Sequence, residues 1–465
     1  MTPVAAAFIV LASTTAIVRA DFESERLENW HQWRGPNADG AAVQANPPLE
    51  WGPDRNVKWK IDVPGEGTAS PIVWQDRVFV LSAIETDRKA ENAPAAEAPA
   101  EDEGEQRGGP GPGGRGGRGG RGGRGFGGDP PPTNYWQFVV LCYNRESGEE
   151  MWRQVAAEEV PHEGHHQTNT FASGSPITDG EYVYASFGSR GIYCYDMEGN
   201  LQWKQDLGDM QTRLGFGEGS SPALHGDTLI VPWDQERDSA VYALDARTGD
   251  VKWRTERDEV SNWGTPLIIE AGDGTQVVLN GSNRVVSYDL ETGKELWKCG
   301  GQTGNAIPSP VRQDEVVYCM TGFRQNAVYA IPLNASGDIT DTDKIAWRNT
   351  EAGPYVPSPV LYEGVLYFNK SNDAILTALE AETGEPLIKP TRVSELGSMY
   401  ASPVAAAGRI YFTDRDGKTL VLQHGPEMEK LAVNDLGEPV DASPAIVGNQ
   451  IFIRGADHLY CIEQQ

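Results

Sequence analysis

Residues 241–253 read VYALDARTGDVKW, and residues 285–297 repeat the arrangement as VVSYDLETGKELW. In both stretches apolar and polar residues alternate, a Thr-Gly turn interrupts the alternation, and a tryptophan ends it. Alternation with a period of two on either side of a glycine-containing turn is typical of two antiparallel β-strands joined as a hairpin. The two stretches therefore predict the last two strands of a repeated β-sheet unit.

A Ser-Pro or Thr-Pro dipeptide sets the period of this repeat. After the first interval, successive dipeptides are 41 to 49 residues apart. Each is followed by a short apolar run, a tight turn, a second alternating strand and then the hairpin described above. The dipeptides begin at Ser70, Ser175, Ser221, Thr265, Ser309, Ser358, Ser402 and Ser443. Eight units of four antiparallel strands at this period predict an all-β fold, an eight-bladed β-propeller.

The last unit, residues 443–465, supplies only three strands before the chain ends. The missing strand is available near the other terminus in NVKWKIDV, residues 56–63, where Trp59 occupies the position of the repeat tryptophan. We expect this strand to complete the eighth blade and close the ring, so that its deletion would destabilise the whole molecule. We also expect the repeat tryptophans to pack between adjacent blades. They are Trp59, Trp152, Trp203, Trp253, Trp297 and Trp347.

The chain has 39 Lys and Arg residues against 67 Asp and Glu, a formal charge of −28. Such an acidic surface disfavours nucleic acid and anionic membranes as partners. Residues 1–20 contain an apolar run from Val4 to Val18 followed by a small-residue cleavage context, which predicts a cleaved signal peptide and a periplasmic or secreted protein. The run is too short for a membrane span. Residues 21–465 are then one monomeric propeller that does not span a membrane.

Residues 84–134 interrupt the period within the first blade. The first part of this insertion is rich in Ala, Glu and Pro, and the second part reads GGRGGRGGRGGRGFGG. Neither part carries enough apolar surface to offset chain entropy, which predicts a disordered spacer or tether, with a polyanion-binding tail as the alternative. The cysteines are odd in number and without a close pair, so we expect free buried thiols. They are Cys142, Cys194, Cys299, Cys319 and Cys461.

The repeats YALDARTGDVKW and SYDLETGKELW resemble the tryptophan-docking repeats of the PQQ-like β-propeller superfamily. Longer segments, among them WHQWRGPNADG, GFGEGSSPALHGDTLIVPWD and YVPSPVLY, resemble exported bacterial PQQ-like repeat proteins. The resemblance covers nearly the whole chain outside the insertion. It implies the fold, but the superfamily includes quinoprotein dehydrogenases, non-enzymatic outer-membrane assembly scaffolds and members without an assigned role, so fold alone does not imply function.

The dehydrogenases of this superfamily hold PQQ beside two adjacent half-cystines and bind calcium through a Glu/Asn/Asp set. This chain has no Cys-Cys pair, and no segment matches the calcium set. The resemblance therefore favours a non-enzymatic binding or scaffolding protein with no cofactor and no catalytic residues. Its partner would be a protein or a small anionic or polyhydroxylated ligand. A PQQ-dependent oxidoreductase with calcium is the alternative.

In a propeller the connections between the second and third strands, and between successive blades, emerge on one face, here called the top face. Arginines, amides and aromatic rings occur in these connections, where they could hold an anionic ligand or else pair with acidic neighbours. The predicted ligand-binding residues are Arg190, Asn262, Trp263, Arg284, Arg324, Tyr355 and Tyr400.

The top face also carries HEGHHQTNTF, residues 162–171, which contains His162, His165 and His166. Adjacent imidazoles point in different directions in most backbone conformations, so a metal site would use two of the three with Glu163 or a group from another blade. The favoured interpretation is a polar lining of the channel mouth, and incidental exposure is the third possibility.

Overall fold

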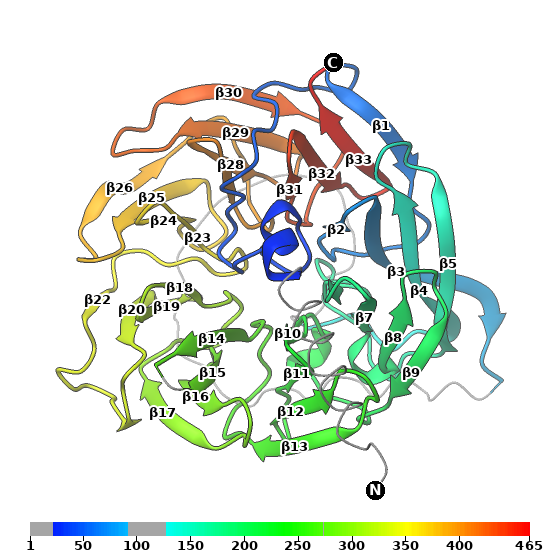
Figure 1. The fold of residues 1–465 in the computed structure, drawn as a ribbon, viewed down its shortest axis with the longest axis horizontal. Coiled ribbons are helices and arrows are strands. Elements are labelled where there is room, and N and C mark those ends of the chain that lie inside the picture. Colours follow the sequence, from blue (N-terminus) through cyan, green and yellow to red (C-terminus); the bar gives the residue numbers. More distant parts are fainter. Residues whose placement is uncertain (1–21, 92–126, 273) are drawn as a thin grey trace, which may run out of the picture.

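The computed structural model describes residues 22–91, 127–272 and 274–465, which form eight antiparallel sheets around a common axis (Figure 1). The predicted all-β, eight-bladed propeller is confirmed. The predicted signal peptide lies outside the described residues, as do residues 92–126 of the predicted insertion. No helix in the described ranges has the length and apolar character needed to cross a membrane.

Each blade contains four strands, arranged in order from the axis outward. The blades are numbered here from the one that begins at Ser70. Blade 1 contains β2 (Ile72–Trp74), β3 (Arg77–Lys89), β4 (Asn134–Asn144) and β5 (Glu150–Glu159); blade 2 contains β6 (Ile177–Thr178), β7 (Tyr182–Ser186), β8 (Ile192–Asp196) and β9 (Leu201–Gln205); blade 3 contains β10 (Ala223–His225), β11 (Thr228–Trp233), β12 (Ala240–Asp245) and β13 (Val251–Glu256); blade 4 contains β14 (Leu267–Ala271), β15 (Gly274–Leu279), β16 (Arg284–Asp289), β17 (Glu295–Gly300) and an added fifth strand, β21 (Gly337–Asp338).

The second half of the ring repeats this order. Blade 5 contains β18 (Val311–Gln313), β19 (Val316–Thr321), β20 (Ala327–Pro332) and β22 (Trp347–Asn349); blade 6 contains β23 (Val360–Tyr362), β24 (Val365–Asn369), β25 (Ile375–Glu380) and β26 (Pro386–Arg392); blade 7 contains β27 (Val404–Ala406), β28 (Arg409–Thr413), β29 (Lys418–Gln423) and β30 (Lys430–Asp435); blade 8 contains β31 (Ala445–Val447), β32 (Gln450–Arg454), β33 (His458–Glu463) and β1 (Val57–Asp62). Three short 3₁₀ helices complete the described elements: η1 (Arg26–Glu28), η2 (Gly188–Arg190) and η3 (Arg213–Gly215).

The N-terminal strand closes the ring as predicted. β1 pairs antiparallel with β33, with Trp59 opposite Cys461 and Asp62 opposite His458. Figure 1 shows the two strands side by side, blue against red, although they come from opposite ends of the chain. The eighth blade therefore depends on residues more than 390 positions apart in sequence.

Five of the six repeat tryptophans each dock one blade onto the next, which confirms their predicted packing role. Trp152, on β5, donates its indole N–H to the carbonyl oxygen of Met197 in blade 2 at 2.9 Å. The same contact, at 2.9 Å in each case, recurs from Trp59 to Arg145, Trp203 to Ala246, Trp253 to Leu290 and Trp347 to Ala381. Trp297 is the exception, because its indole donates to the side chain of Gln276 within its own blade.

The Ser-Pro and Thr-Pro dipeptides are joined by hydrogen bonds into a ring that is open at one junction, a role that the sequence did not reveal. The backbone N–H of Ser70 donates to the hydroxyl oxygen of Ser175, and that of Ser175 donates to the hydroxyl of Ser221. The remaining links run from Ser221 to Thr265, Thr265 to Ser309, Ser309 to Ser358, Ser358 to Ser402 and Ser402 to Ser443, all between 2.8 and 3.2 Å. We call these eight residues the hydroxyl belt.

The belt has one missing link, where blade 8 meets blade 1. The hydroxyl of Ser70 is buried and has no hydrogen-bond partner among the described residues. The buried guanidinium of Arg454, on β32 of blade 8, crosses this junction and donates to the carbonyl of Leu81 and, at 3.4 Å, to the hydroxyl of Ser82 in blade 1. The side chain of Arg454 therefore links blades 8 and 1 where the hydroxyl belt is interrupted.

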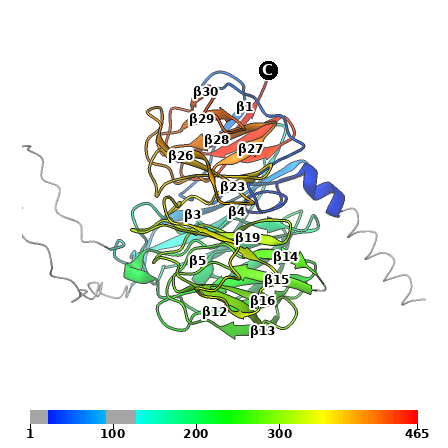
Figure 2. The ribbon, with the colours of Figure 1, turned by 90° about the vertical axis from the view of Figure 1, so that its left-hand side faces the viewer.

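Residues 22–56 cross the bottom face of the propeller, opposite the top face. Trp30 bridges to Val73 of blade 1, and Ala41 bridges to Ala405 of blade 7. Between them, the indole of Trp33 donates to the hydroxyl of Ser309 at 3.0 Å. Figure 2 shows this blue segment on the right-hand face of the molecule. The position of residues 22–56 could not be predicted from the sequence, because this segment lies outside the repeat.

The hairpin of β3 and β4 extends into the range predicted as the insertion. β3 continues to Lys89, which pairs with Asn134, and Ile84 pairs with Gln137. The guanidinium of Arg88 stacks on the ring of Tyr135 at 3.5 Å. Alternation of side chains in this stretch and its cross-strand contacts sustain the strand beyond residue 84, the predicted boundary.

The five cysteines are free and buried, as predicted, and all of them lie in strands. Burial raises the pKa of each thiol, to about 12 for Cys142 and about 11 for Cys299. A thiol in this state is a small apolar packing group rather than a nucleophile.

Candidate functional site

A hollow of about 2370 Å³ opens on the top face along the propeller axis, and we call it the funnel. Besides Trp33 of the N-terminal segment, five aromatic side chains line it: Phe216, Trp263, Phe323, Tyr355 and Tyr400. They come from connections between blades or between second and third strands, the positions at which the sequence analysis expected ligand-binding groups. Trp263, Arg324, Tyr355 and Tyr400 were predicted as binding residues, and the structure brings these four together around one hollow.

The aromatic side chains are held in place by one another and by the backbone. The rings of Phe323 and Tyr355 are 4.9 Å apart and tilted by 32°. Trp263 lies 6.4 Å from Phe216, and its indole N–H donates to the carbonyl of Gly217 at 2.7 Å. Burial raises the pKa of Tyr355 above its ordinary value, so this phenol stays neutral at physiological pH. The funnel therefore presents fixed, uncharged ring surfaces.

Three arginines in the funnel wall are free of internal partners. Arg213 lies in η3, Arg237 in the β11–β12 connection and Arg324 in the β19–β20 connection, and all three are exposed. Within the described ranges their guanidinium groups form neither an ion pair nor a hydrogen bond, although Arg324 stacks at 5.2 Å on Phe323. This is unusual in a chain whose formal charge is −28.

The carboxylates of the funnel, in contrast, all have partners. Glu163 accepts hydrogen bonds from the backbone and hydroxyl of Thr212, at 3.0 and 2.9 Å. Glu236 accepts from the backbone of Ser261 at 3.1 Å, and Asp441 forms a bidentate pair with Arg415 at 2.7 and 3.0 Å. Asp129, the fourth, also interacts within the chain. The funnel carboxylates are therefore held by hydrogen bonds or by Arg415, whereas its three arginines form no ion pair among the described residues.

Three other predicted binding residues are engaged elsewhere. Arg190 pairs with Glu159 at 2.7 Å and with Asp209, and Arg284 pairs with Asp258 at 2.7 Å. Asn262 is buried and donates to Asp234 at 3.1 Å. None of the three lines the funnel, because nearby carboxylates on neighbouring connections neutralise or bury them.

Arg213 and Arg237, which line the funnel together with Arg324, were not predicted from the sequence. Arg213 lies in the connection from blade 2 to blade 3, a position equivalent to that of the histidine loop, and this equivalence was the available signal. Arg237 lies among Asp234, Glu236 and Asp238, a setting that suggests internal pairing. Only the folded loop shows that Asp234 instead pairs with the buried Arg257, at 2.7 Å.

The three histidines lie on the top face but face different partners. His162 hydrogen-bonds with the carbonyl of Met210 at 2.6 Å and with Arg190 at 3.0 Å. His165 lies 3.2 Å from Glu66, and His166 hydrogen-bonds with Thr168 at 2.8 Å and packs edge-on against Phe216.

The pKa values of two of these imidazoles are shifted in opposite directions. Burial lowers the pKa of His165, but its hydrogen bonds to Glu66 and to the carbonyl of His166 outweigh burial and leave the pKa raised. Burial lowers the pKa of His166, and the neighbouring His165 and Arg415 lower it further while Asp129 opposes the shift.

The residues predicted as metal ligands are therefore not brought together. Within the part of the chain that the structure describes, no group of three or more His, Cys, Asp or Glu side chains could hold a metal ion. The loop instead lines the mouth of the funnel, where His166 is a wall residue.

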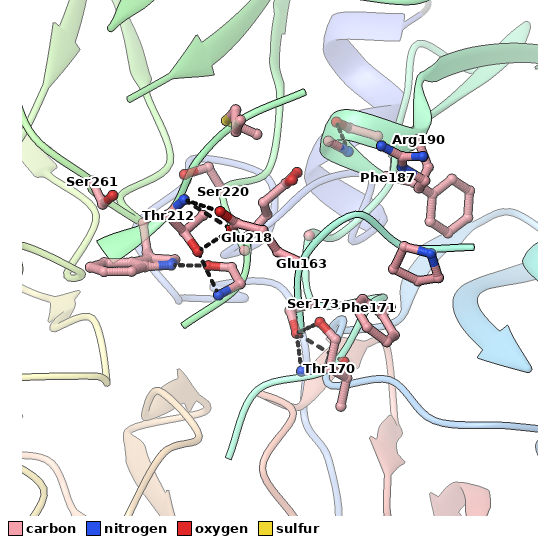
Figure 3. A pocket seen from close by; sticks show the side chains of 18 of the residues that line it. Glu163, Thr170, Phe171, Ser173, Phe187, Arg190, Thr212, Glu218, Ser220 and Ser261 are labelled. Carbon is pink, nitrogen blue, oxygen red and sulfur yellow. Dashed lines mark hydrogen bonds between the residues drawn. The ribbon is translucent and has the colours of Figure 1, made fainter. Parts of the chain in front are cut away.

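A smaller chamber of about 70 Å³ lies behind the funnel wall (Figure 3). Glu163, Thr212 and Trp263 line both the chamber and the funnel. Inside the chamber, burial raises the pKa of Glu218, although hydrogen bonds from the backbone and hydroxyl of Ser189 oppose the shift. A chamber of this size holds about two water molecules.

Comparison with known proteins places this geometry in a family. The sequence profile of a family described as outer membrane protein assembly factor BamB matches residues 137–389, just over half of the chain. No curated protein matches the sequence. Together with the eight docked blades, the profile match shows that the chain belongs to the PQQ-like β-propeller family.

Several solved structures share the fold. BamB from Moraxella catarrhalis is 15% identical with a TM-score of 0.50, covering 70% of this chain and 89% of that one. Quinohemoprotein alcohol dehydrogenase from Comamonas testosteroni is 12% identical with a TM-score of 0.59, covering 98% and 84%. A europium-containing methanol dehydrogenase is 10% identical with a TM-score of 0.61, covering 95% and 99%. At these identities the likeness concerns the fold alone.

Proposed function

We propose that this protein is an exported, non-enzymatic binding propeller that recognises an acidic ligand, or an acidic segment of a partner protein, in the funnel. The observation that carries the proposal is the set of three guanidinium groups, Arg213, Arg237 and Arg324, that have no partner among the described residues of a strongly acidic chain. An arginine fork forms two parallel hydrogen bonds to a carboxylate, phosphate or sulfate.

The architecture supports recognition at low entropic cost. Each arginine lies in a short connection between strands of a blade, or between blades, that are docked by tryptophan and belt contacts. Rigidly held groups lose little freedom when a ligand binds. Aromatic rings between the arginines add flat apolar surface, which suits a ligand with planar or ring-shaped parts.

The matched family profile is described as an outer membrane protein assembly factor, which favours a protein partner and a location outside the cytoplasm. A partner that presents glutamate- or aspartate-rich segments would match the funnel in charge. Long-range attraction of such a segment would raise the association rate and would weaken with salt.

The second candidate is a PQQ-dependent oxidoreductase, favoured by the dehydrogenase folds that cover nearly the whole chain. Arginines and aromatic rings would suit a planar tricarboxylate such as PQQ. The described residues do not fit the calcium that this chemistry would require, because they contain no suitable donor cluster. The binding role rests instead on the three arginines that line the funnel.

The test compares two variants with the same loss of charge. The first is Arg213→Gln/Arg237→Gln/Arg324→Gln. The control is Arg247→Gln/Arg254→Gln/Arg348→Gln, whose arginines lie on the turns and outer strands and already pair with acidic residues. A fluorescent octaglutamate peptide is the probe, read by anisotropy at low salt. We expect the funnel variant to bind at least about tenfold more weakly than the control.

Equal binding by the two triple variants would contradict the proposal, because it would attribute binding to net charge alone. The oxidoreductase candidate is tested separately by adding PQQ and Ca²⁺ and measuring dye reduction with alcohols and sugars. Turnover that depends on PQQ would replace the binding role with the enzymatic one.

A further inference from the structure

The hydroxyl belt lies at the narrow end of the funnel as well as between the blades. Six of its members line the hollow, whereas Ser70 and Ser175 do not. The six are Ser221, Thr265, Ser309, Ser358, Ser402 and Ser443. We call this ring of six hydroxyls the neck.

The hydroxyls of the neck can still donate hydrogen bonds to a ligand. Each of its hydroxyl oxygens accepts a backbone N–H from the preceding blade, so one lone pair is already used. A hydroxyl also carries one hydrogen that it can donate. None of the six donates to an acceptor within the described residues, so six O–H groups around the axis remain available.

These hydroxyls are nearly inaccessible to bulk solvent except through the funnel. Ser358 and Ser402 are each 2% exposed, and Thr265, the most open, is 7% exposed. Trp33 of the N-terminal segment also lines the hollow and donates to the hydroxyl of Ser309, which covers the neck from below. A buried hydroxyl without an acceptor is unfavourable, and a ligand that supplies acceptors would satisfy it.

We propose that the neck is an oxyanion subsite whose belt hydroxyls bind a carboxylate, phosphate or sulfate group by donating hydrogen bonds to it. The inference rests on the proposed function of the funnel, and it narrows the ligand class. The ligand is an elongated polyanion with one acidic group at its end, in the neck, and at least one more beside Arg213, Arg237 or Arg324.

An oxyanion fits this ring better than a cation or an apolar group. The neck offers hydrogens rather than lone pairs, since each oxygen already accepts an N–H group. Above it, the guanidinium groups of Arg213, Arg237 and Arg324 form no ion pair among the described residues, whereas the funnel carboxylates are held by internal contacts. Both features stabilise negative charge, as donors directed at an anion do in other buried sites.

Anomalous scattering locates the anion directly. Crystals of the full chain are soaked in selenate, a tetrahedral dianion, and anomalous difference maps are calculated. A peak on the axis within hydrogen-bonding distance of the neck hydroxyls supports the inference. Peaks only beside the funnel arginines overturn the neck subsite while leaving the proposed function standing, and no peak at either place overturns the neck subsite too.

A matched pair of variants tests the neck in solution. Ser358→Ala and Ser175→Ala each remove one belt acceptor and cause the same structural loss, but only Ser358 lines the hollow. Binding of inorganic phosphate is followed by the rise in Tm with concentration at constant ionic strength. We expect Ser358→Ala to weaken phosphate binding about tenfold and Ser175→Ala to leave it unchanged.

Equal weakening in the two variants would overturn the inference, because it would show a structural effect of breaking the belt. Ser358→Thr, which keeps the hydroxyl, is the variant to use if Ser358→Ala fails to fold. It should bind phosphate like the unmodified protein, and loss of binding with the hydroxyl intact would also contradict the subsite.

Discussion

The glycine of each Thr-Gly or equivalent turn lies against the docked tryptophan of the preceding blade. Gly249 has a φ of +79°, and a Cβ at this position would lie 2.6 Å from the ring of Trp203. The same contact occurs between Gly199 and Trp152 and between Gly384 and Trp347. The spacing of glycine and tryptophan in the sequence repeat therefore reflects one physical contact between neighbouring blades.

This contact makes Gly249→Ala more damaging than an alanine in a comparable turn. Gly226, in the same blade, has a φ of +59° but no atom within 4 Å of its would-be Cβ. Both substitutions add the strain of positive φ, about 1 kcal/mol, and only Gly249→Ala adds overpacking of about 2 kcal/mol. Urea unfolding should show the larger loss for Gly249→Ala, and equal losses would mean that the turn-to-indole contact contributes little.

Glu259 gives the protein a specific pH dependence. Burial raises the pKa of its carboxyl from 4.5 to about 7, although Arg257 and the backbone N–H groups of Asn283 and Arg284 oppose the shift. Between these two values the folded state binds more protons than the unfolded state, so stability falls as pH rises through this window.

The variant Glu259→Gln cannot titrate and should lose this dependence. Between pH 4.5 and pH 7.5, we expect the free energy of unfolding of the unmodified protein to fall by about 3 kcal/mol more than that of the variant. Urea titrations at the two pH values measure the difference. The same fall in both proteins would contradict the assignment to Glu259.

At the residue scale the sequence predicted the kinds of groups at the site but not their state. Arg190 and Arg324 look equivalent in sequence, since both lie in connections between second and third strands. Arg190 is neutralised by Glu159, at the end of β5, and by Asp209, in the connection after β9, whereas Arg324 has no acidic partner among the described residues. Pairing of this kind depends on contacts between distant segments and cannot be deduced from a repeat pattern.

At the scale of elements, strands that obey the repeat were predictable and departures from it were not. The connection after β20 is long and lacks the Thr-Gly turn, and within it β21 pairs parallel with β17. Trp297, on β17, then has no turn glycine to pack against, is fully buried and bonds to Gln276. One altered connection therefore explains both the added strand and the tryptophan that does not dock.

Deletion of β1, residues 57–62, tests the element that closes the ring. β1 supplies the outer strand of blade 8 and the docking indole of Trp59, so its loss should lower the thermal midpoint of the whole molecule as one cooperative transition. Deletion of residues 337–338, which removes β21 without opening the ring, is the control. Thermal unfolding followed by circular dichroism distinguishes the two. A similar, small effect of both changes would contradict the closing role of β1.

At the scale of the whole molecule, the sequence predicted the blade count, the ring closure and the face that carries the variable connections. It did not predict that residues 22–56 cover the opposite face, because a segment without a repeat has no register from which its position can be inferred. The contacts that hold it, such as Trp51 to Asn434 and Arg34 to Pro359, join residues more than 320 positions apart. Of this segment, Trp33 reaches the funnel, where it bonds to Ser309.

The junction between blades 8 and 1 is held together differently from the other junctions of the belt. Elsewhere around the axis a backbone amide and a hydroxyl hold each pair of neighbours, but here Ser70 lacks its donor and Arg454 spans the joint. The joint between the two ends of the chain is therefore made by side chains, namely the indole of Trp59 and the guanidinium groups of Arg145 and Arg454, without the belt bond present at the other joints.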